Sequence, residues 1–164
     1  MDFSRYQSDR IQIVTSPINI DRIINEVTFS LRQKSEKKGI RLIPQTVPVT
    51  VTADGNKLKQ VVLNVLDNAI NFSYKDSEIH IIQWINKHSV LVEITNVGMG
   101  IKQENLEHIM ESFYKIDPKS VGAGLGLAIS RSIINKHGGT LKIESEYGKS
   151  TTVTISLPLE GVSV

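Results

Sequence analysis

The chain has 164 residues, a formal net charge of +2 and no cysteine. A chain of this length is expected to form one domain that buries about 68–70% of its unfolded surface, which needs no metal or disulfide for support. The lack of cysteine excludes disulfides, thiolate nucleophiles and cysteine-based zinc sites, and it fits a cytoplasmic protein. The near-neutral charge argues against nucleic acid as a partner. No apolar run approaches the roughly 20 residues that span a bilayer, so direct membrane contact is not expected.

The first half of the chain predicts a connector, a helix, two short strands and a second helix. The connector is polar and lacks a long apolar period, whereas the first helix shows apolar residues at helical spacing and a glycine stop. Asp54 suits the N-cap of the second helix. The expected ranges are 1–16 for the connector, 18–39 for the first helix, 40–43 and 49–53 for the strands, and 58–72 for the second helix.

The second half predicts a hairpin, two helices and a closing hairpin. The last helix ends at the pair Gly138 and Gly139. The expected ranges are strands 78–84 and 89–95, helices 103–110 and 128–137, and strands 140–146 and 151–157. This order predicts an α/β fold, a two-layer sandwich in which the helices pack on one face of a single mixed sheet.

The helix expected over 58–72 combines an apolar stripe with a row of asparagines. Asn64, Asn68 and Asn71 are spaced four and three residues apart, so their side chains lie on one face. Asparagine is a poorer helix former than the lysine or glutamate that usually covers a solvated face. One explanation is local hydrogen bonding at the surface. The explanation that we favour is that amide oxygens face a hydrated Mg²⁺ that bridges phosphates.

A glycine-rich run, Gly122-Ala123-Gly124-Leu125-Gly126-Leu127, precedes the last predicted helix. Such a backbone can bend around an anion and offer unobstructed N–H groups, and the helix directs the positive end of its dipole to the same place. Tight turns use glycine as well. The hypothesis that this run binds an anion is therefore supported by the row of asparagines and by a second glycine loop.

The second glycine loop, Asn96-Val97-Gly98-Met99-Gly100-Ile101, directly follows a predicted strand. Asn96 at the strand end can read the edge of a base, Gly98 and Gly100 would let a flat ring approach the backbone, and Ile101 would form an apolar wall. The alternative is a simple strand-to-helix turn. Further along, Phe113-Tyr114-Lys115 either anchors the short helix in the core or holds a mobile cover. Together these segments indicate a nucleotide site.

The same segments carry a family resemblance. Residues 58–69 resemble the N box of sensor histidine kinases, 96–101 their first glycine box, Phe113-Tyr114 their F box and 122–127 their second glycine box. The resemblance implies the GHKL (Bergerat) ATP-binding fold, with ATP and Mg²⁺ held between helices and a flexible lid. On this basis, the expected organisation is 1–16 as a connector from an upstream dimerisation domain, 17–160 as the ATP-binding domain and 161–164 as a tail.

The resemblance also implies roles for single residues. Asn68 would bind Mg²⁺ directly, with Asn64 nearby, and Phe72 would stack on adenine. Asn96 would accept a hydrogen bond from the adenine amino group, and Thr151 would support that contact. The glycine-rich run would cradle the phosphates.

The sequence departs from the family pattern at three places. Asn96 replaces an aspartate, so the hydrogen bond to adenine lacks a charge and ATP should bind about five- to tenfold more weakly. Asn71 stands where lysine or arginine is usual, and the lid after Phe113 is short.

We interpret all four histidines, His80, His88, His108 and His137, as structural or surface residues, because none lies in a Ser-His-Glu-like setting on a long helix. The expected function is therefore the ATP·Mg²⁺-binding catalytic domain of a two-component histidine kinase. It would donate the γ-phosphate to a histidine of its own dimerisation domain, with a response regulator as the downstream partner, in the cytoplasmic part of a membrane-anchored sensor. The isolated chain should not phosphorylate itself.

Two alternatives remain at this point. The first is a degenerate GHKL domain that has weakened or lost ATP binding and acts as a protein-interaction module, which the changes at Asn96 and Asn71 favour. The second is another GHKL enzyme, such as an anti-sigma serine kinase or a gyrase-like ATPase. Those enzymes usually have a glutamate where Asn64 stands.

Overall fold

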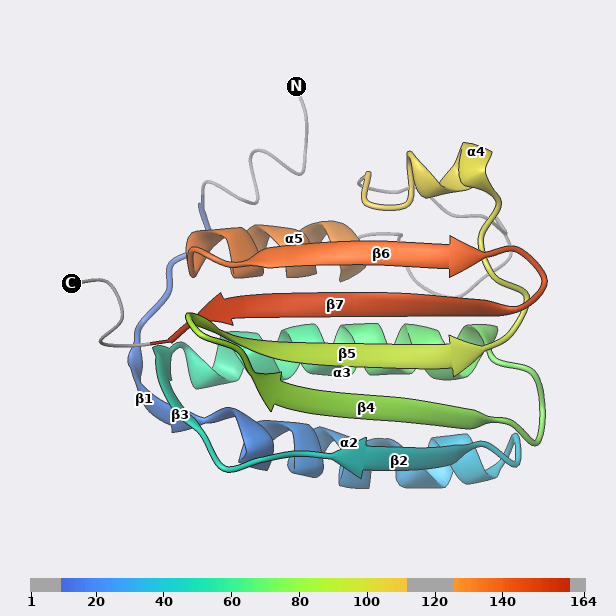
Figure 1. The fold of residues 1–164 in the computed structure, drawn as a ribbon, viewed down its shortest axis with the longest axis horizontal. Helices are drawn as coiled ribbons and strands as arrows, with labels where there is room; N and C mark the ends of the chain where they lie inside the picture. The colour runs from blue at the N-terminus through green and yellow to red at the C-terminus, as the bar shows by residue number, and fades with distance from the viewer. Residues whose placement is uncertain (1–9, 112–125, 160–164) are drawn as a thin grey trace.

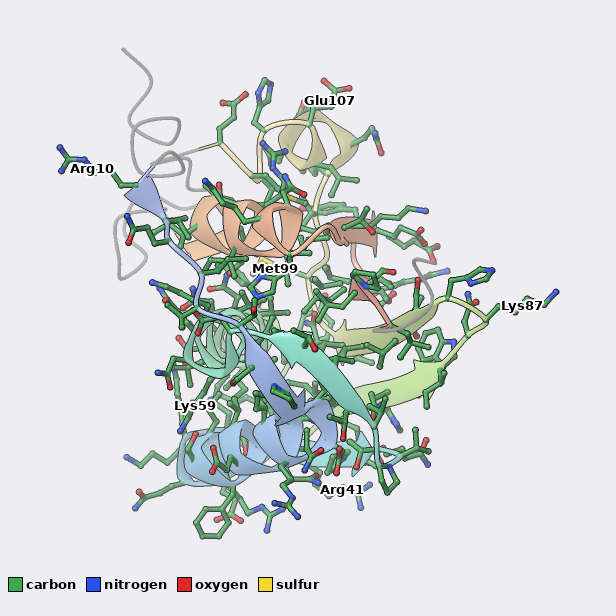
Figure 2. The ribbon with its side chains drawn as sticks, turned by 90° about the vertical axis from the view of Figure 1, so that its left-hand side faces the viewer. Arg10, Arg41, Lys59, Lys87, Met99 and Glu107 are labelled. Carbon is green, nitrogen blue, oxygen red and sulfur yellow. The ribbon has the colours of Figure 1, made fainter. Side chains whose placement is uncertain are left out.

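The computed structural model describes residues 10–111 and 126–159, which form a layer of helices on one face of a sheet. Helices α2, α3 and α5 all lie behind the sheet in Figure 1. Figure 2 shows the layers edge-on, with Lys59 on the helical side and Lys87 at the opposite, sheet side. The helices are α2 (Ile20–Glu36), α3 (Gly55–Phe72), α4 (Gln103–Leu106) and α5 (Gly126–Lys136). The predicted two-layer α/β sandwich is confirmed.

The main sheet has five strands in the order β2-β4-β5-β7-β6. β2 pairs with β4 in parallel, and the other neighbours are antiparallel. β2 and β6 are therefore the two edges of this sheet. The strands are β1 (Ser16–Asn19), β2 (Arg41–Gln45), β3 (Thr50–Ala53), β4 (Glu78–Ile85), β5 (Ser89–Val97), β6 (Thr140–Glu146) and β7 (Ser150–Pro158).

The sequence predicts one mixed sheet that includes all the strands, but β3 does not belong to the main sheet. It pairs antiparallel with β1 in a separate two-stranded sheet, in which Ser16 lies opposite Ala53. Because β1 occupies residues 16–19, α2 begins at Ile20 rather than at residue 18. The helix predicted over 103–110 also ends early, at Leu106.

The start of α3 follows the prediction. The Asp54 carboxylate accepts a hydrogen bond from the backbone N–H of Lys57 at 3.2 Å, which satisfies one of the free donors of the first helical turn. The same carboxylate accepts a second bond from the N–H of Val14 at 2.9 Å. Asp54 therefore ties the N-terminal segment to the start of α3.

The core lies between the helices and the inner face of the sheet. Val90, Val92 and Ile94 of β5 are buried and alternate with half-buried residues, as expected for a strand with one covered face. Asn96 occupies the next inward position and is 4% exposed. The strand thus delivers a polar side chain to the apolar face, at the end of the sheet where the site lies. Within the described residues, none of the helices has the length and apolar character required to cross a membrane.

Candidate nucleotide-binding site

A pocket lies between α3, α5 and the inner face of the sheet. The pocket is open to solvent on one side. Most of its wall is apolar, and its few polar side chains come from different elements. The lining residues are Val65, Asn68, Ala69, Phe72, Ile94, Asn96, Gly100, Ile101, Ile109, Leu127, Ile143, Thr151 and Val153.

Two of the polar residues form a cross-strand pair. Asn96 of β5 lies directly opposite Thr151 of β7 in the antiparallel register, and both line the pocket. The Asn96 carboxamide makes no hydrogen bond to another residue in the part of the chain that the structure describes. A carboxamide that lines a pocket can exchange hydrogen bonds with a ligand, because it carries both an acceptor and donors. The pair therefore offers hydrogen-bonding groups to a ligand at one end of an otherwise apolar cavity.

Thr151 is held in place by a residue that the sequence reading missed. The Ser145 hydroxyl on β6 lies 2.8 Å from Thr151 Oγ1, donates to the Ser150 carbonyl at 2.8 Å and accepts from the N–H of Ile101 at 2.8 Å. Ser145 thus connects the polar end of the pocket to the loop that carries Ile101. A serine facing inward from an edge strand, one position before a charged residue, gives no sequence signal that separates it from an ordinary strand serine.

The three asparagines predicted to lie on one face of α3 have different surroundings in the structure. Asn68 lines the pocket. Asn64 instead faces the first turn of α5, with its Nδ2 atom 3.5 Å from the Gly126 carbonyl and 3.4 Å from Ser130 Oγ. Asn71 is exposed and does not line the pocket. Of the three asparagines, Asn68 is therefore the one that lines the pocket, while Asn64 contacts the first turn of α5.

The glycines of the 96–101 loop are required by close backbone packing. A Cβ atom on Gly98 would lie 2.1 Å from the Phe72 carbonyl oxygen, at the end of α3. Gly100 has a φ of +66°, and its Cβ would lie 2.3 Å from the Glu146 carbonyl oxygen. Gly100 also lines the pocket, whereas Gly98 does not. These glycines let the loop pack tightly against α3 and the β6–β7 turn, a reason that the sequence alone did not reveal.

Most of the second glycine-rich run and the aromatic pair lie outside the described residues. This applies to Phe113, Tyr114, Lys115, Gly122, Gly124 and Leu125. The last two residues of the run, Gly126 and Leu127, begin α5, and Leu127 lines the pocket. The N-terminus of α5, with its partial positive charge, therefore lies beside the pocket.

The histidines make structural or surface contacts. His137 is tied to the backbone on both sides of its ring, with Nδ1 2.8 Å from the Ile133 carbonyl and Nε2 3.0 Å from the N–H of Asp54. His80 and His108 are exposed beside Glu78 and Glu111, and the hydrogen bond to Glu111 raises the pKa of His108. These contacts agree with the interpretation from the sequence.

Comparison with known proteins gives the same family as the motifs. A family model described as histidine kinase-, DNA gyrase B- and HSP90-like ATPase matches residues 53–161. The sensor histidine kinase YclK of Bacillus subtilis is 32% identical over 165 residues, which cover 97% of this chain and 35% of YclK. The chain thus spans about a third of the length of that relative.

Solved structures share the fold. The catalytic domain of the histidine kinase ThkA is 28% identical, with a TM-score of 0.80 over 89% of this chain and 96% of that domain. A mycobacterial sensor histidine kinase, MprB, is also 28% identical, with a TM-score of 0.79 over 89% of this chain and 98% of the solved one. The motifs, the fold and the matched family model agree: the chain belongs to the histidine kinase-, DNA gyrase B- and HSP90-like ATPases, as an ATP-binding catalytic domain of the sensor histidine kinase type.

Proposed function

We propose that the pocket holds ATP together with Mg²⁺ and that the chain presents the γ-phosphate to a histidine on a separate dimerisation domain. The observation that supports this most strongly is the pocket itself. An apolar cavity on the inner face of the sheet carries the Asn96–Thr151 pair at its polar end, and Asn68 and the start of α5 lie beside it.

The base would occupy the apolar part of the pocket. Phe72 and Ile101 supply flat and aliphatic surface there, and Asn96 and Thr151 supply the acceptors for an exocyclic amino group. The residues present therefore fit a purine whose edge carries a hydrogen-bond donor.

The triphosphate would extend toward Asn68 and the N-terminus of α5. No group of three histidine, cysteine or acidic side chains that could hold a metal occurs among residues 10–111 and 126–159. A Mg²⁺ at this place would be held by the carboxamide oxygen of Asn68, phosphate oxygens and water, since Mg²⁺ takes oxygen ligands and usually keeps several waters. When bound, Mg²⁺ would neutralise charge on the phosphates.

The chain's own contribution to phosphoryl transfer would be positioning and electrostatic stabilisation. The interpretation of the four histidines leaves no phosphoacceptor among them, so the acceptor would lie on a dimerisation domain of the intact kinase. A response regulator would then receive the phosphoryl group, and we place the whole reaction in the cytoplasm.

Calorimetric titration of ATP and ADP into the chain, with and without MgCl₂, tests the proposal. We expect ATP to bind, and to bind more tightly with Mg²⁺. The Asn68→Ala variant should lose the Mg²⁺-dependent part of the affinity, whereas Asn135→Ala, an exposed asparagine on α5, should keep it. Absence of nucleotide binding in a folded chain would contradict the proposal and favour the alternative of a degenerate interaction module.

A further inference from the structure

We propose that Ser145 is a positioning residue that selects the base, because it fixes the direction of the Thr151 hydroxyl. The inference rests on the proposed nucleotide site. It concerns which purine the pocket accepts, and it follows from counting the protons in one small hydrogen-bond network.

The Ser145 hydroxyl has three oxygen or nitrogen partners, each at 2.8 Å. A serine hydroxyl has one proton to donate and two lone pairs that can accept. The Ser150 carbonyl can only accept, so it takes the Ser145 proton, and the N–H of Ile101 can only donate, so it takes one lone pair. Two oxygens at 2.8 Å need a proton between them. The third contact therefore requires Thr151 to donate its proton to the remaining lone pair of Ser145.

This assignment determines what Thr151 offers to the pocket that it lines. Its single proton is directed at Ser145, so toward any ligand the Thr151 hydroxyl can only accept. An exocyclic amino group, as on adenine, would find an acceptor there. A carbonyl oxygen at the same position, as on hypoxanthine or guanine, would face the lone pairs of the Thr151 hydroxyl. Two acceptors cannot form a hydrogen bond, so this contact would be unfavourable.

Asn96 does not enforce this choice. A carboxamide has both an acceptor and a donor end, and rotation exchanges them. Nothing in the described part of the chain holds the Asn96 carboxamide by a hydrogen bond in one orientation. Asn96 can therefore serve either an amino or a carbonyl group. The choice of base is therefore limited by the Thr151 hydroxyl, whose direction Ser145 fixes.

The experiment compares ATP with ITP, which replaces the amino group by a carbonyl, in the presence of Mg²⁺. Wild type should bind ATP about tenfold more tightly than ITP, because ITP leaves a buried acceptor facing another acceptor. Ser145→Ala frees the Thr151 hydroxyl to turn and donate, so the ATP:ITP ratio should fall to about twofold or less. Ser145→Thr, which retains a hydroxyl, should restore the ratio.

A matched control exists on the same strands. Thr152 Oγ1 lies 3.0 Å from Thr95 Oγ1 on the neighbouring strand, and neither residue lines the pocket. Thr152→Val removes one hydroxyl of this pair and so breaks a comparable hydrogen bond between neighbouring strands. It should leave the ATP:ITP affinity ratio unchanged. If Ser145→Ala does not fold, Thr151→Val supplies the second variant. It removes the acceptor with little change of volume and should likewise bring the ratio toward one.

The outcomes separate the two proposals. If folded wild type binds neither nucleotide, the proposed function is wrong. If wild type binds ATP but does not discriminate against ITP, or if Ser145→Ala and Thr151→Val both retain the wild-type ratio, the role of Ser145 is overturned while the ATP site stands.

Discussion

The ring of His137 accepts a hydrogen bond from the backbone N–H of Asp54, with Nε2 and N separated by 3.0 Å. The other ring nitrogen, Nδ1, lies 2.8 Å from the Ile133 carbonyl, which can only accept, so it carries the proton. One neutral imidazole thus links the last turn of α5 to the junction of β3 and α3. Its two partners are 83 and four residues away in the sequence.

Replacement of His137 by alanine should destabilise the fold by about 1–3 kcal/mol, because the N–H of Asp54 loses its acceptor in a partly buried position. Chemical denaturation measures the change. His88→Ala, which removes an exposed ring from the β4–β5 hairpin, should change stability by no more than about 0.5 kcal/mol. Equal effects of the two variants would contradict the structural role of His137.

Asp54 should make the stability of the domain depend on pH. Burial raises the pKa of its carboxyl, but hydrogen bonds from the backbone N–H groups of Val14 and Lys57 and the positive charge of the Lys57 side chain outweigh burial, so the pKa lies below its ordinary value of 3.8. A lowered carboxyl pKa stabilises the fold above the unfolded-state pKa, and this stabilisation is lost as the pH falls through the folded-state pKa.

Asp54→Ala should therefore cost about 1 kcal/mol at pH 7, the usual value for an N-cap, and less as the pH falls below about 4. Urea unfolding between pH 3 and pH 7 measures this difference. Asp54→Asn is the control, because asparagine caps helices but does not titrate. If the difference in the free energy of unfolding between wild type and Asp54→Ala does not change with pH, the Asp54 carboxylate is not the cause of that difference.

Lys38 should stabilise the C-terminus of α3. Its Nζ atom donates to the carbonyls of Ile70, Asn71 and Ser73 at 2.9, 3.2 and 3.1 Å. A cation at this end also interacts favourably with the helix dipole. Lys38→Met keeps most of the side-chain length and should destabilise the domain by about 1 kcal/mol. Lys37→Met at the exposed neighbour removes the same charge and should have little effect, so thermal denaturation of the pair isolates the contact.

Two glycine-to-alanine changes should separate folding from binding. In Gly98→Ala, the new methyl would lie 2.1 Å from the Phe72 carbonyl oxygen, and we expect a loss of about 2–4 kcal/mol. In Gly126→Ala the nearest atom would be 3.7 Å away, on Asn64, so stability should change by less than about 0.5 kcal/mol. If the glycine-rich run cradles phosphates, Gly126→Ala should still weaken ATP binding. Unfolding and nucleotide titration of both variants decide this.

Asn96→Asp should strengthen ATP binding by about five- to tenfold, because a charged acceptor contributes more to a hydrogen bond than a neutral one. Isothermal titration of both chains with ATP gives the ratio. Equal affinities would refute the idea that the missing charge at position 96 weakens ATP binding.

The local elements were well predicted because their signals are local. The apolar period of α3 and its cap at Asp54 lie within one short segment, and so does the alternation of Val90, Val92 and Ile94 in β5. The strand β1 was missed because it has four residues, includes Pro17 and forms only by pairing with β3, more than 30 residues away. Pairings between distant segments leave no periodic trace in the sequence.

The same distinction applies to the site. Asn68, Phe72, Asn96 and Thr151 were identified from the motifs, and all four line the pocket. The contact of Asn64 with Ser130 and the network of Ser145 could not be predicted, since each depends on how elements far apart in the chain pack together. Motif patterns indicate which residues face a ligand, but not which residues hold them in place.

Because β6 lies at the edge of the main sheet, hydrogen exchange in this strand can report whether a nucleotide is bound in the pocket. β6 carries Ile143 and Ser145 yet is hydrogen-bonded to one strand, β7, so its amides should open at lower free energy than those of the central strand β5. A ligand that packs on Ile143 would restrain this outer strand. Deuterium uptake at residues 140–146 should then slow when nucleotide is added, while uptake in β5, already slow, changes little.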